Sequence, residues 1–135
     1  MNSTNVQSDE PSTAELQQRV EAIDRLVSHV WMVRAFLKHC DEAVDDEELQ
    51  EIHRDLYDFM LSLGSSLADG EYAAYLKQAR KKLSKLRKAT DLFVAIQPEV
   101  STHTNFQMAA RSLKTAVDQM QPLIKPNEQA IRSSP

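Results

Sequence analysis

The fold is decided by residues 45–96, which read DDEELQEIHRDLYDFMLSLGSSLADGEYAAYLKQARKKLSKLRKATDLFVAI. Two sets of apolar residues in this stretch are separated by steps of three and four, the spacing that places side chains on one stripe of an α-helix. The first set is Leu49, Ile52, Leu56, Phe59, Leu63 and Leu67, and the second is Tyr72, Leu76, Ala79, Leu83, Leu86, Thr90 and Phe93. Two such stripes that face each other form a helical hairpin, which the rest of the chain has to cover.

The turn between these two helices has two candidate positions. One is residues 64–66, Gly-Ser-Ser, which would end the first helix at Leu63 and start the second near the end of that triplet. A glycine inside a helix costs ~1 kcal/mol relative to alanine, which favours this boundary. We nevertheless place the turn at Asp69 and Gly70, because Leu67 keeps the register of the first helix.

Two capping boxes mark the starts of further helices. In this motif a Ser or Thr side chain accepts a backbone N–H three residues on, and a Glu or Gln at that position reaches back. Ser12 with Glu15 opens a helix that continues to about Cys40. Thr104 with Gln107 opens a shorter helix nearer the C-terminus.

Prolines are expected to end the last two helices. The residue before a proline is pushed out of the α region, so Pro98 and Pro122 should each act as a stop. The predicted helices therefore span about residues 12–40, 45–68, 71–96 and 104–121. With mostly short links they predict an all-α, up-down-up-down antiparallel four-helix bundle. The alternative is a three-helix core with the last helix docked obliquely.

Composition agrees with one all-α domain. The 135 residues include only 2 Gly and 6% aromatic residues, which disfavours an all-β fold with many turns. A chain of this length buries roughly two-thirds of its unfolded surface, enough for one core. We predict a disordered N-terminal tail over residues 1–11, a helical-bundle domain over 12–122 and a flexible C-terminal tail over 123–135.

Charge and cysteine content indicate a cytoplasmic protein. The net charge of −4 and the pI near 5.5 give no overall attraction to nucleic acid, so a nucleic-acid partner is not expected. The longest apolar run has about five residues, against the ~20 that a membrane span needs. Cys40 is the only cysteine, which is typical of a reducing compartment. Its thiolate is disfavoured at the negative end of the first helix.

Patterns for metal binding are missing from the sequence. A di-metal carboxylate bundle needs a Glu three residues before a His on two helices, and no histidine here has one. With a single cysteine and no His-x-x-x-His pair, the ligands of a zinc site are also missing. We therefore expect no metal and no cofactor.

Residues 77–88 read KQARKKLSKLRK and contain no acidic side chain. One interpretation is a docking surface for an acidic partner or for phosphates. We favour neutralisation within the molecule, because this segment of an antiparallel hairpin lies beside the early part of the preceding helix. Each exposed ion pair contributes ~0.5 kcal/mol. The acidic residues there are Glu47, Glu48, Glu51 and Asp55.

Three arginines are directed toward the apolar stripes. At about 100° per residue, Arg34 lies near the stripe of the first helix, and Arg80 and Arg87 lie near that of the third. A buried guanidinium needs a partner, so we expect internal ion pairs or side chains that extend to solvent. The candidate acids are Glu48, Glu51, Asp55 and Asp91. The alternative is a pocket for an anion or small molecule, or a weak active site, formed by Arg34, His53, Tyr57 and Arg87.

Arg34 and His39 are separated by four residues on one predicted helix. This spacing resembles the Arg-x4-His signature of the HEPN helical ribonucleases, over residues 34–39 alone. Ala35 stands where that family prefers a polar residue. The resemblance implies that Arg34 and His39 would line an RNA-cleaving cleft formed by two protomers.

The first helix carries more apolar surface than one packing seam requires. Trp31, Met32 and Phe36 lie off its main stripe, so the helix is apolar nearly all round at this point. Our principal prediction is a non-enzymatic protein that acts through protein–protein contacts at these three residues. The contact is made either with a protein partner or with a second copy in a homodimer.

Overall fold

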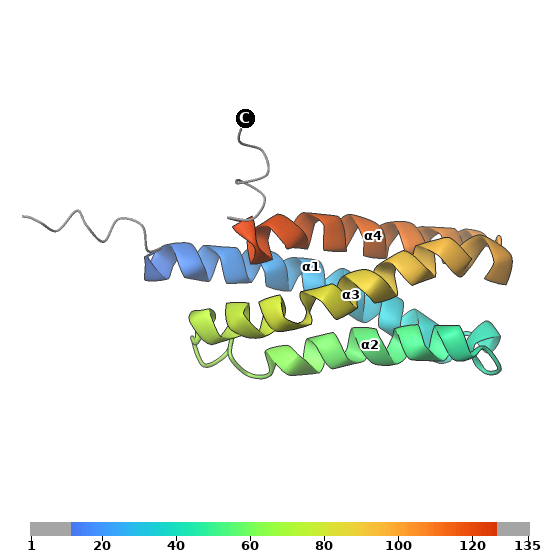
Figure 1. Cartoon of the computed structure of the whole chain (residues 1–135), viewed down its shortest axis with the longest axis horizontal. Coiled ribbons are helices and arrows are strands. Elements are labelled where there is room, and N and C mark those ends of the chain that lie inside the picture. The colour runs from blue at the N-terminus through green and yellow to red at the C-terminus, as the bar shows by residue number, and fades with distance from the viewer. Residues whose placement is uncertain (1–11, 127–135) are drawn as a thin grey trace, which may run out of the picture.

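The computed structural model describes residues 12–126, which form four helices (Figure 1). Helix α1 spans Thr13–His39, α2 spans Glu47–Leu63, α3 spans Tyr72–Val100 and α4 spans Thr104–Ile124, and a short 3-10 helix, η2, spans Asp41–Ala43. The described residues contain no strand, so the predicted all-α class is confirmed. The tail predicted over residues 1–11, and residues 127–135 of the C-terminal tail, lie outside the described residues.

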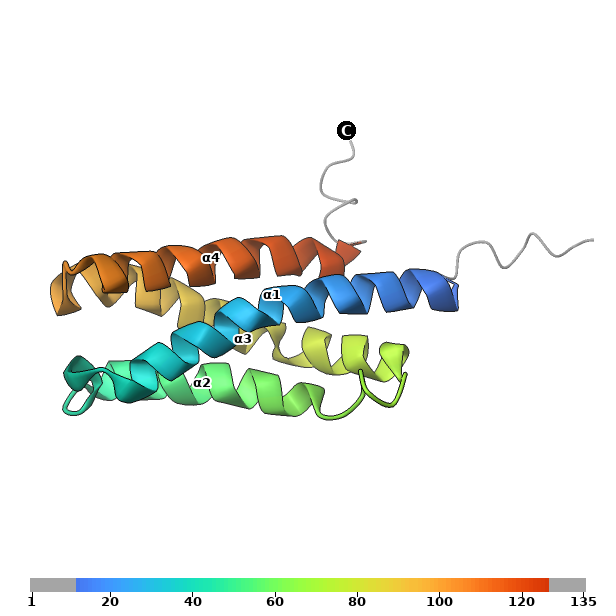
Figure 2. The ribbon, with the colours of Figure 1, turned by 180° about the vertical axis from the view of Figure 1, so that it is seen from behind.

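Consecutive helices run in opposite directions, as Figures 1 and 2 show from two sides. α4 packs against both α1 and α3, as closely as α2 packs on α3. The alternative of a three-helix core with an oblique fourth helix is therefore wrong. Residue numbers rise along α1 as they fall along α4 in the contacts Arg19–Leu123, His29–Ser112 and Phe36–Phe106.

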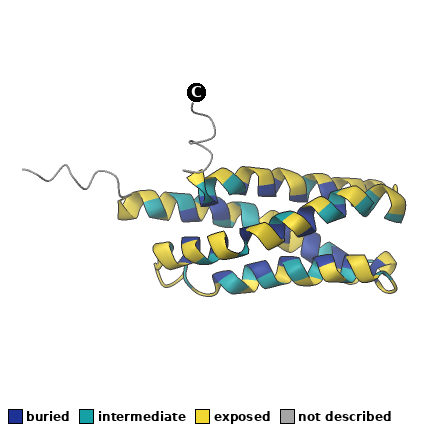
Figure 3. Cartoon of the chain, viewed as in Figure 1, coloured by how far each residue is buried: buried dark blue, intermediate teal, exposed yellow. Residues whose placement is uncertain are grey.

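The core consists of the inward stripes of all four helices (Figure 3). All of the stripe residues that defined the hairpin are buried except Leu67 and Tyr72, which are partly buried against the core. Within residues 12–126, no helix combines the length and the apolar character needed to cross a membrane. The largest fully buried side chains are Tyr75, Phe59, Phe93, Ile23, Leu37, Leu49, Ile52, Leu56, Leu86, Leu113, Met120 and Ile124.

One of the two predicted capping boxes is present. The Ser12 hydroxyl accepts the N–H of Glu15 at 3.1 Å, and the Glu15 carboxylate accepts the N–H of Ser12 at 2.9 Å. At the start of α4 the prediction was wrong, because Thr104 is already helical. The capping acceptor is Nδ1 of His103, which takes the N–H of Asn105 at 3.0 Å.

The end of α2 differs from the boundary that we favoured. The helix stops at Leu63, as the rival boundary predicted, and residues 64–70 form turns before α3 begins. Gly64 has φ +57° and ψ −143°, a conformation that ends the helix and that side chains with a Cβ rarely adopt. Leu67 therefore packs against the core from the segment of turns after α2, not from a further turn of that helix.

We expect Gly64→Ala to lower the free energy of unfolding by about 1–3 kcal/mol. The added Cβ meets nothing within 4 Å, so the cost comes from the positive φ alone. Urea denaturation measures it, with Ala68→Ser in the same turn region as a neutral control. Equal stability of the Gly64 variant and the parent would contradict the backbone argument.

Both prolines that were expected to stop helices lie inside them. α3 continues through Pro98 to Val100, and α4 continues through Pro122 to Ile124. The predicted ends at residues 96 and 121 were therefore wrong. A proline in the last turn removes one hydrogen bond. At α4 the burial of Ile124 offsets that loss, since its side chain is completely covered.

Candidate functional site

Arg34 lies between two aromatic rings, one on α1 and one on α2. Its Cζ atom is 4.4 Å from the centroid of the Trp31 ring and 5.1 Å from that of the Tyr57 ring. Only 9% of the residue is exposed, as expected from its position beside the α1 stripe. The predicted ion pair between this arginine and a carboxylate is not present. Within the described chain Arg34 has no ion pair, and its buried Nε has no hydrogen-bond partner.

His53 extends this arrangement along α2. Its ring is stacked on Tyr57 one helical turn away, with centroids 6.4 Å apart and ring planes 10° apart. Its Nε2 atom is buried and also has no hydrogen-bond partner among the described residues. Burial of the ring lowers the pKa of His53 below its ordinary value, and the charges of Arg34, Lys38 and Arg54 lower it further. The imidazole is therefore neutral at pH 7.

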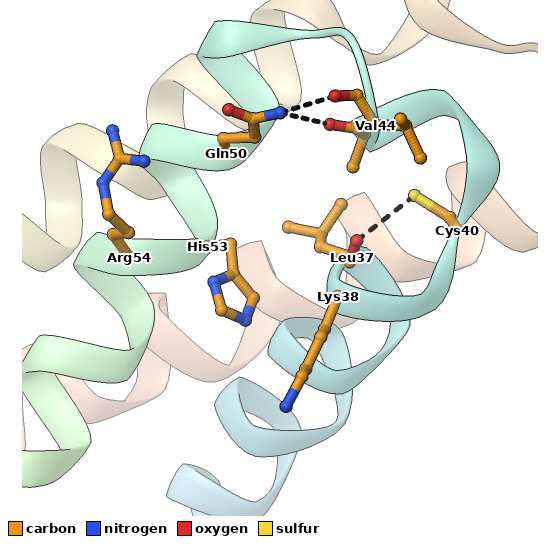
Figure 4. Close-up of a pocket in the computed structure, with 8 residues that line it drawn as sticks. Leu37, Lys38, Cys40, Val44, Gln50, His53 and Arg54 are labelled. Carbon is orange, nitrogen blue, oxygen red and sulfur yellow. Dashed lines mark hydrogen bonds between the residues drawn. The ribbon is translucent and has the colours of Figure 1, made fainter.

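A pocket of about 350 Å³ opens beside His53 at one end of the α1–α2 pair. Figure 4 shows His53 between Lys38 of α1 and Arg54 of α2. The amide of Gln50 donates to two carbonyl oxygens of the link between these helices, at 2.9 and 2.8 Å. These bonds fix the link, and with it the rim of the pocket.

Arg87, the fourth predicted ligand-binding residue, lies elsewhere. It joins α3 to α4 by donating from Nη1 to Asp118 at 2.8 Å and from Nε and Nη2 to Gln121 at 3.2 and 2.8 Å. Asp91, a predicted partner, is 3.8 Å away. Arg80 is exposed, which agrees with the expected alternative of a side chain that extends to solvent. The structure thus brings together three of the four predicted ligand-binding residues.

The basic segment 77–88 is partly neutralised by α2, as we favoured. Lys82 lies 3.3 Å from the Asp58 carboxylate, and Lys85 lies 3.7 Å from both Asp55 and Asp58. Asp55 was an expected partner. Asp58, one turn beyond Asp55 on α2, takes the place of the three expected glutamates.

The three predicted interface residues differ in exposure. Trp31 is 50% exposed and Met32 is 65% exposed. Phe36 is partly buried, and its ring meets that of Phe106 on α4 edge to face, with centroids 4.9 Å apart. The apolar surface that α1 leaves uncovered is therefore centred on Trp31 and Met32.

The HEPN-like pair does not share a site in this structure. Five residues along a helix correspond to a rotation of about 140°. Arg34 accordingly faces α2, whereas His39 is exposed and does not line the pocket beside His53. No specific observation supports the nuclease alternative.

Cys40 lines the same pocket in an unreactive form. Its thiol donates to the carbonyl oxygen of Leu37 at 3.5 Å, and burial raises its pKa above the ordinary value. A thiol in this state is a poor nucleophile at neutral pH. Over residues 12–126, no three His, Cys, Asp or Glu side chains gather closely enough to hold a metal ion.

Sequence reasoning missed Lys38, Arg54 and Leu61 as members of this region. Lys38 and Arg54 line the pocket, and Leu61 is exposed one turn beyond Tyr57 on α2. The spacing of His53, Tyr57 and Leu61 by four residues was the available signal, since it puts all three on one side of α2. Whether these three residues lie beside α1 depends on how α1 and α2 pack against each other.

The fold and this region define a four-helix bundle with a cationic and aromatic seam between α1 and α2. No protein-family model, no curated protein and no solved structure matches the chain. Its function is therefore argued from its own residues.

Proposed function

We propose that this chain is a non-enzymatic protein-interaction module that binds its partner on the outer side of α1 and α2. The observation that supports this is the distribution of large hydrophobic side chains at the surface. Of six such exposed side chains in the described part of the chain, five lie on α1, α2 or the link between them, and none lies on α3. These five residues form what we call the docking face: Trp31, Met32, Val44, Tyr57 and Leu61.

The docking face has the residue types that dominate binding energy at protein interfaces. Tryptophan, tyrosine and arginine are the side chains most often found at such energetic centres. Trp31 and Tyr57 flank Arg34, so all three of these residue types meet at one point of the face. Antiparallel packing of α1 and α2 puts Leu61 one turn beyond Tyr57, at the level of Trp31. Arg34, in contact with both rings, connects the parts of this face on the two helices.

The charge of α1 indicates what kind of partner this face accepts. Residues 25–40 contain Arg25, Arg34 and Lys38 and no acidic residue. A symmetric contact with its two-fold axis at this part of α1 would bring the cations of the two copies close together, which is unfavourable. We therefore assign the docking face to a segment of a different protein that carries apolar and acidic side chains, in preference to a second copy of this chain.

Photo-cross-linking tests this assignment. The photoreactive residue p-benzoylphenylalanine replaces Met32 in the full chain, and the variant is irradiated in the cells of origin. Lys81, exposed on α3, is replaced in the same way as the matched control. We expect a protein to be captured from position 32 and not from position 81. Trp31→Ala should then weaken binding of that purified protein roughly 30-fold, as at an interface hot spot.

Two outcomes would overturn the assignment. The first is binding of the purified partner that neither Trp31→Ala nor Met32→Glu weakens. The second is a dimer of the chain in sedimentation equilibrium that Met32→Glu dissociates, because the docking face would then be occupied by a second copy. Met32 is a suitable position for both variants because its side chain is largely in solvent.

A further inference from the structure

Arg34 is a largely buried cation that forms no hydrogen bond with another described residue. A guanidinium has five N–H donors in a planar fork. In the described residues Arg34 forms no ion pair, and its solvent-inaccessible Nε has no acceptor. Burial of an unpaired charge is costly, and the rings of Trp31 and Tyr57 offset only part of that cost. The side chain thus carries a positive charge and an unused N–H donor, and the described residues supply no anion to it.

Three further groups beside Arg34 are also without acidic partners. Lys38 and Arg54 line the pocket and form no ion pair over residues 12–126. His53 lies between them, with its buried Nε2 unpartnered. Four cations elsewhere in the bundle are paired with carboxylates. These paired cations are Lys82, Lys85, Arg87 and Lys114.

We propose that this cluster, Arg34 with Lys38, His53 and Arg54, binds a carboxylate carried by an aspartate or glutamate side chain of the docked partner. The inference rests on the proposed function, since the partner brings the carboxylate. A planar carboxylate matches the guanidinium fork with two parallel N–H···O bonds. His53 donates a further hydrogen bond when its proton is on Nε2. Apolar side chains of the partner then pack on the docking face around this ion pair.

We expect the Trp31 ring to turn aside when a carboxylate binds to Arg34. The ring lies 4.4 Å from the guanidinium and is half exposed, so it has room to turn toward solvent. Trp31 is the only tryptophan in the chain. Its fluorescence therefore reports on the loss of the contact with Arg34 without any label.

The first arm of the test uses sodium acetate as the carboxylate probe on the purified full-length protein. Sodium phosphate and sodium chloride are compared at the same ionic strength. We expect acetate to change the Trp31 emission and to shift the NMR resonance of the Arg34 Nε–H group. Both changes should saturate in the millimolar range, and chloride should produce neither.

The pKa of His53 gives a second readout that a purely structural role would not move. The groups that face its ring are Arg34, Lys38 and Cys40 from the α1 side and Arg54 and Tyr57 on α2. A bound carboxylate opposes the repulsion from the three cations, so acetate should raise the pKa of His53. The sign follows from linkage, because a proton and an anion at neighbouring positions stabilise each other.

Variants at Arg34 identify the group responsible. Arg34→Lys keeps the charge and loses the planar fork, so it should weaken acetate binding roughly tenfold. Arg34→Met should abolish it, and this apolar side chain of similar length is expected to leave the bundle folded. Arg25→Gln, exposed on the same helix, should bind acetate like the parent. Thermal unfolding of each variant checks that the fold is kept.

The possible failures are distinguishable. Acetate that acts no differently from chloride would overturn the carboxylate site, while partner capture at Met32 would still support the proposed function. Phosphate that binds ten times more tightly than acetate would overturn the choice of a carboxylate. Acetate binding without any partner captured at Met32 would overturn both the proposed function and the partner as the source of the carboxylate.

Discussion

Replacing Phe93 by alanine is expected to lower the free energy of unfolding by about 3–5 kcal/mol. Phe93 lies on α3 and is completely buried, so the truncation leaves a cavity that the surrounding helices fill only in part. The stability of a domain is about 5–15 kcal/mol, so this single change removes a large share of it. Urea denaturation followed by circular dichroism measures the loss.

Leu61→Ala is the matched control for Phe93. Leu61 is 59% exposed on α2, so its truncation should change stability by no more than about 0.5 kcal/mol. If both variants lost a similar free energy of unfolding, burial would not determine the cost of truncation. The arrangement of the core described here would then be incorrect.

Ile124→Ala is expected to cost about 2–4 kcal/mol, although the sequence places this residue in a flexible tail. In the structure α4 passes Pro122, and Ile124 is completely buried. Arg19 secures the same end of the helix, donating from Nε and Nη2 to the carbonyl oxygen of Leu123 at 3.1 and 2.9 Å. Thermal unfolding of the variant and the parent at equal concentration measures the difference.

Leu123→Ala is the neighbouring control, because that side chain is only partly buried. It should cost less than half as much as the Ile124 variant, in proportion to the area that each removes from water. An Ile124 variant as stable as the parent would show that the chain beyond Pro122 contributes nothing to the core.

The sequence was sufficient to predict the existence of the four helices, because the apolar residues of each helix are regularly spaced. Steps of three and four recur over several turns in each helix, and the residues on those stripes are the ones found buried. The boundaries were less predictable. Gly64 ends α2 through a positive φ that no neighbouring residue signals. Pro98 and Pro122 are tolerated because each lies in the last turn of its helix, where one lost hydrogen bond is a small cost.

The candidate site was predictable in part, for a similar reason. The helical phase of Arg34 places it on the inward side of α1, and the same rule puts His53 and Tyr57 on one side of α2. The position of an arginine around the helix axis does not by itself show which groups its inward-directed side chain contacts. We expected either a carboxylate or extension to solvent, whereas in the structure Arg34 lies between the rings of Trp31 and Tyr57.

The sequence by itself determined that this is an all-α chain with four amphipathic helices, because helical periodicity is a local property of the residue order. Only the tertiary structure decided that Arg34, Trp31, His53 and Tyr57 share one seam while Arg87 pairs with α4. The register and rotation of one helix against another follow from the packing of the whole core. Whether two residues about twenty positions apart come into contact therefore depends on how their two helices pack, which the sequence of either helix alone does not specify.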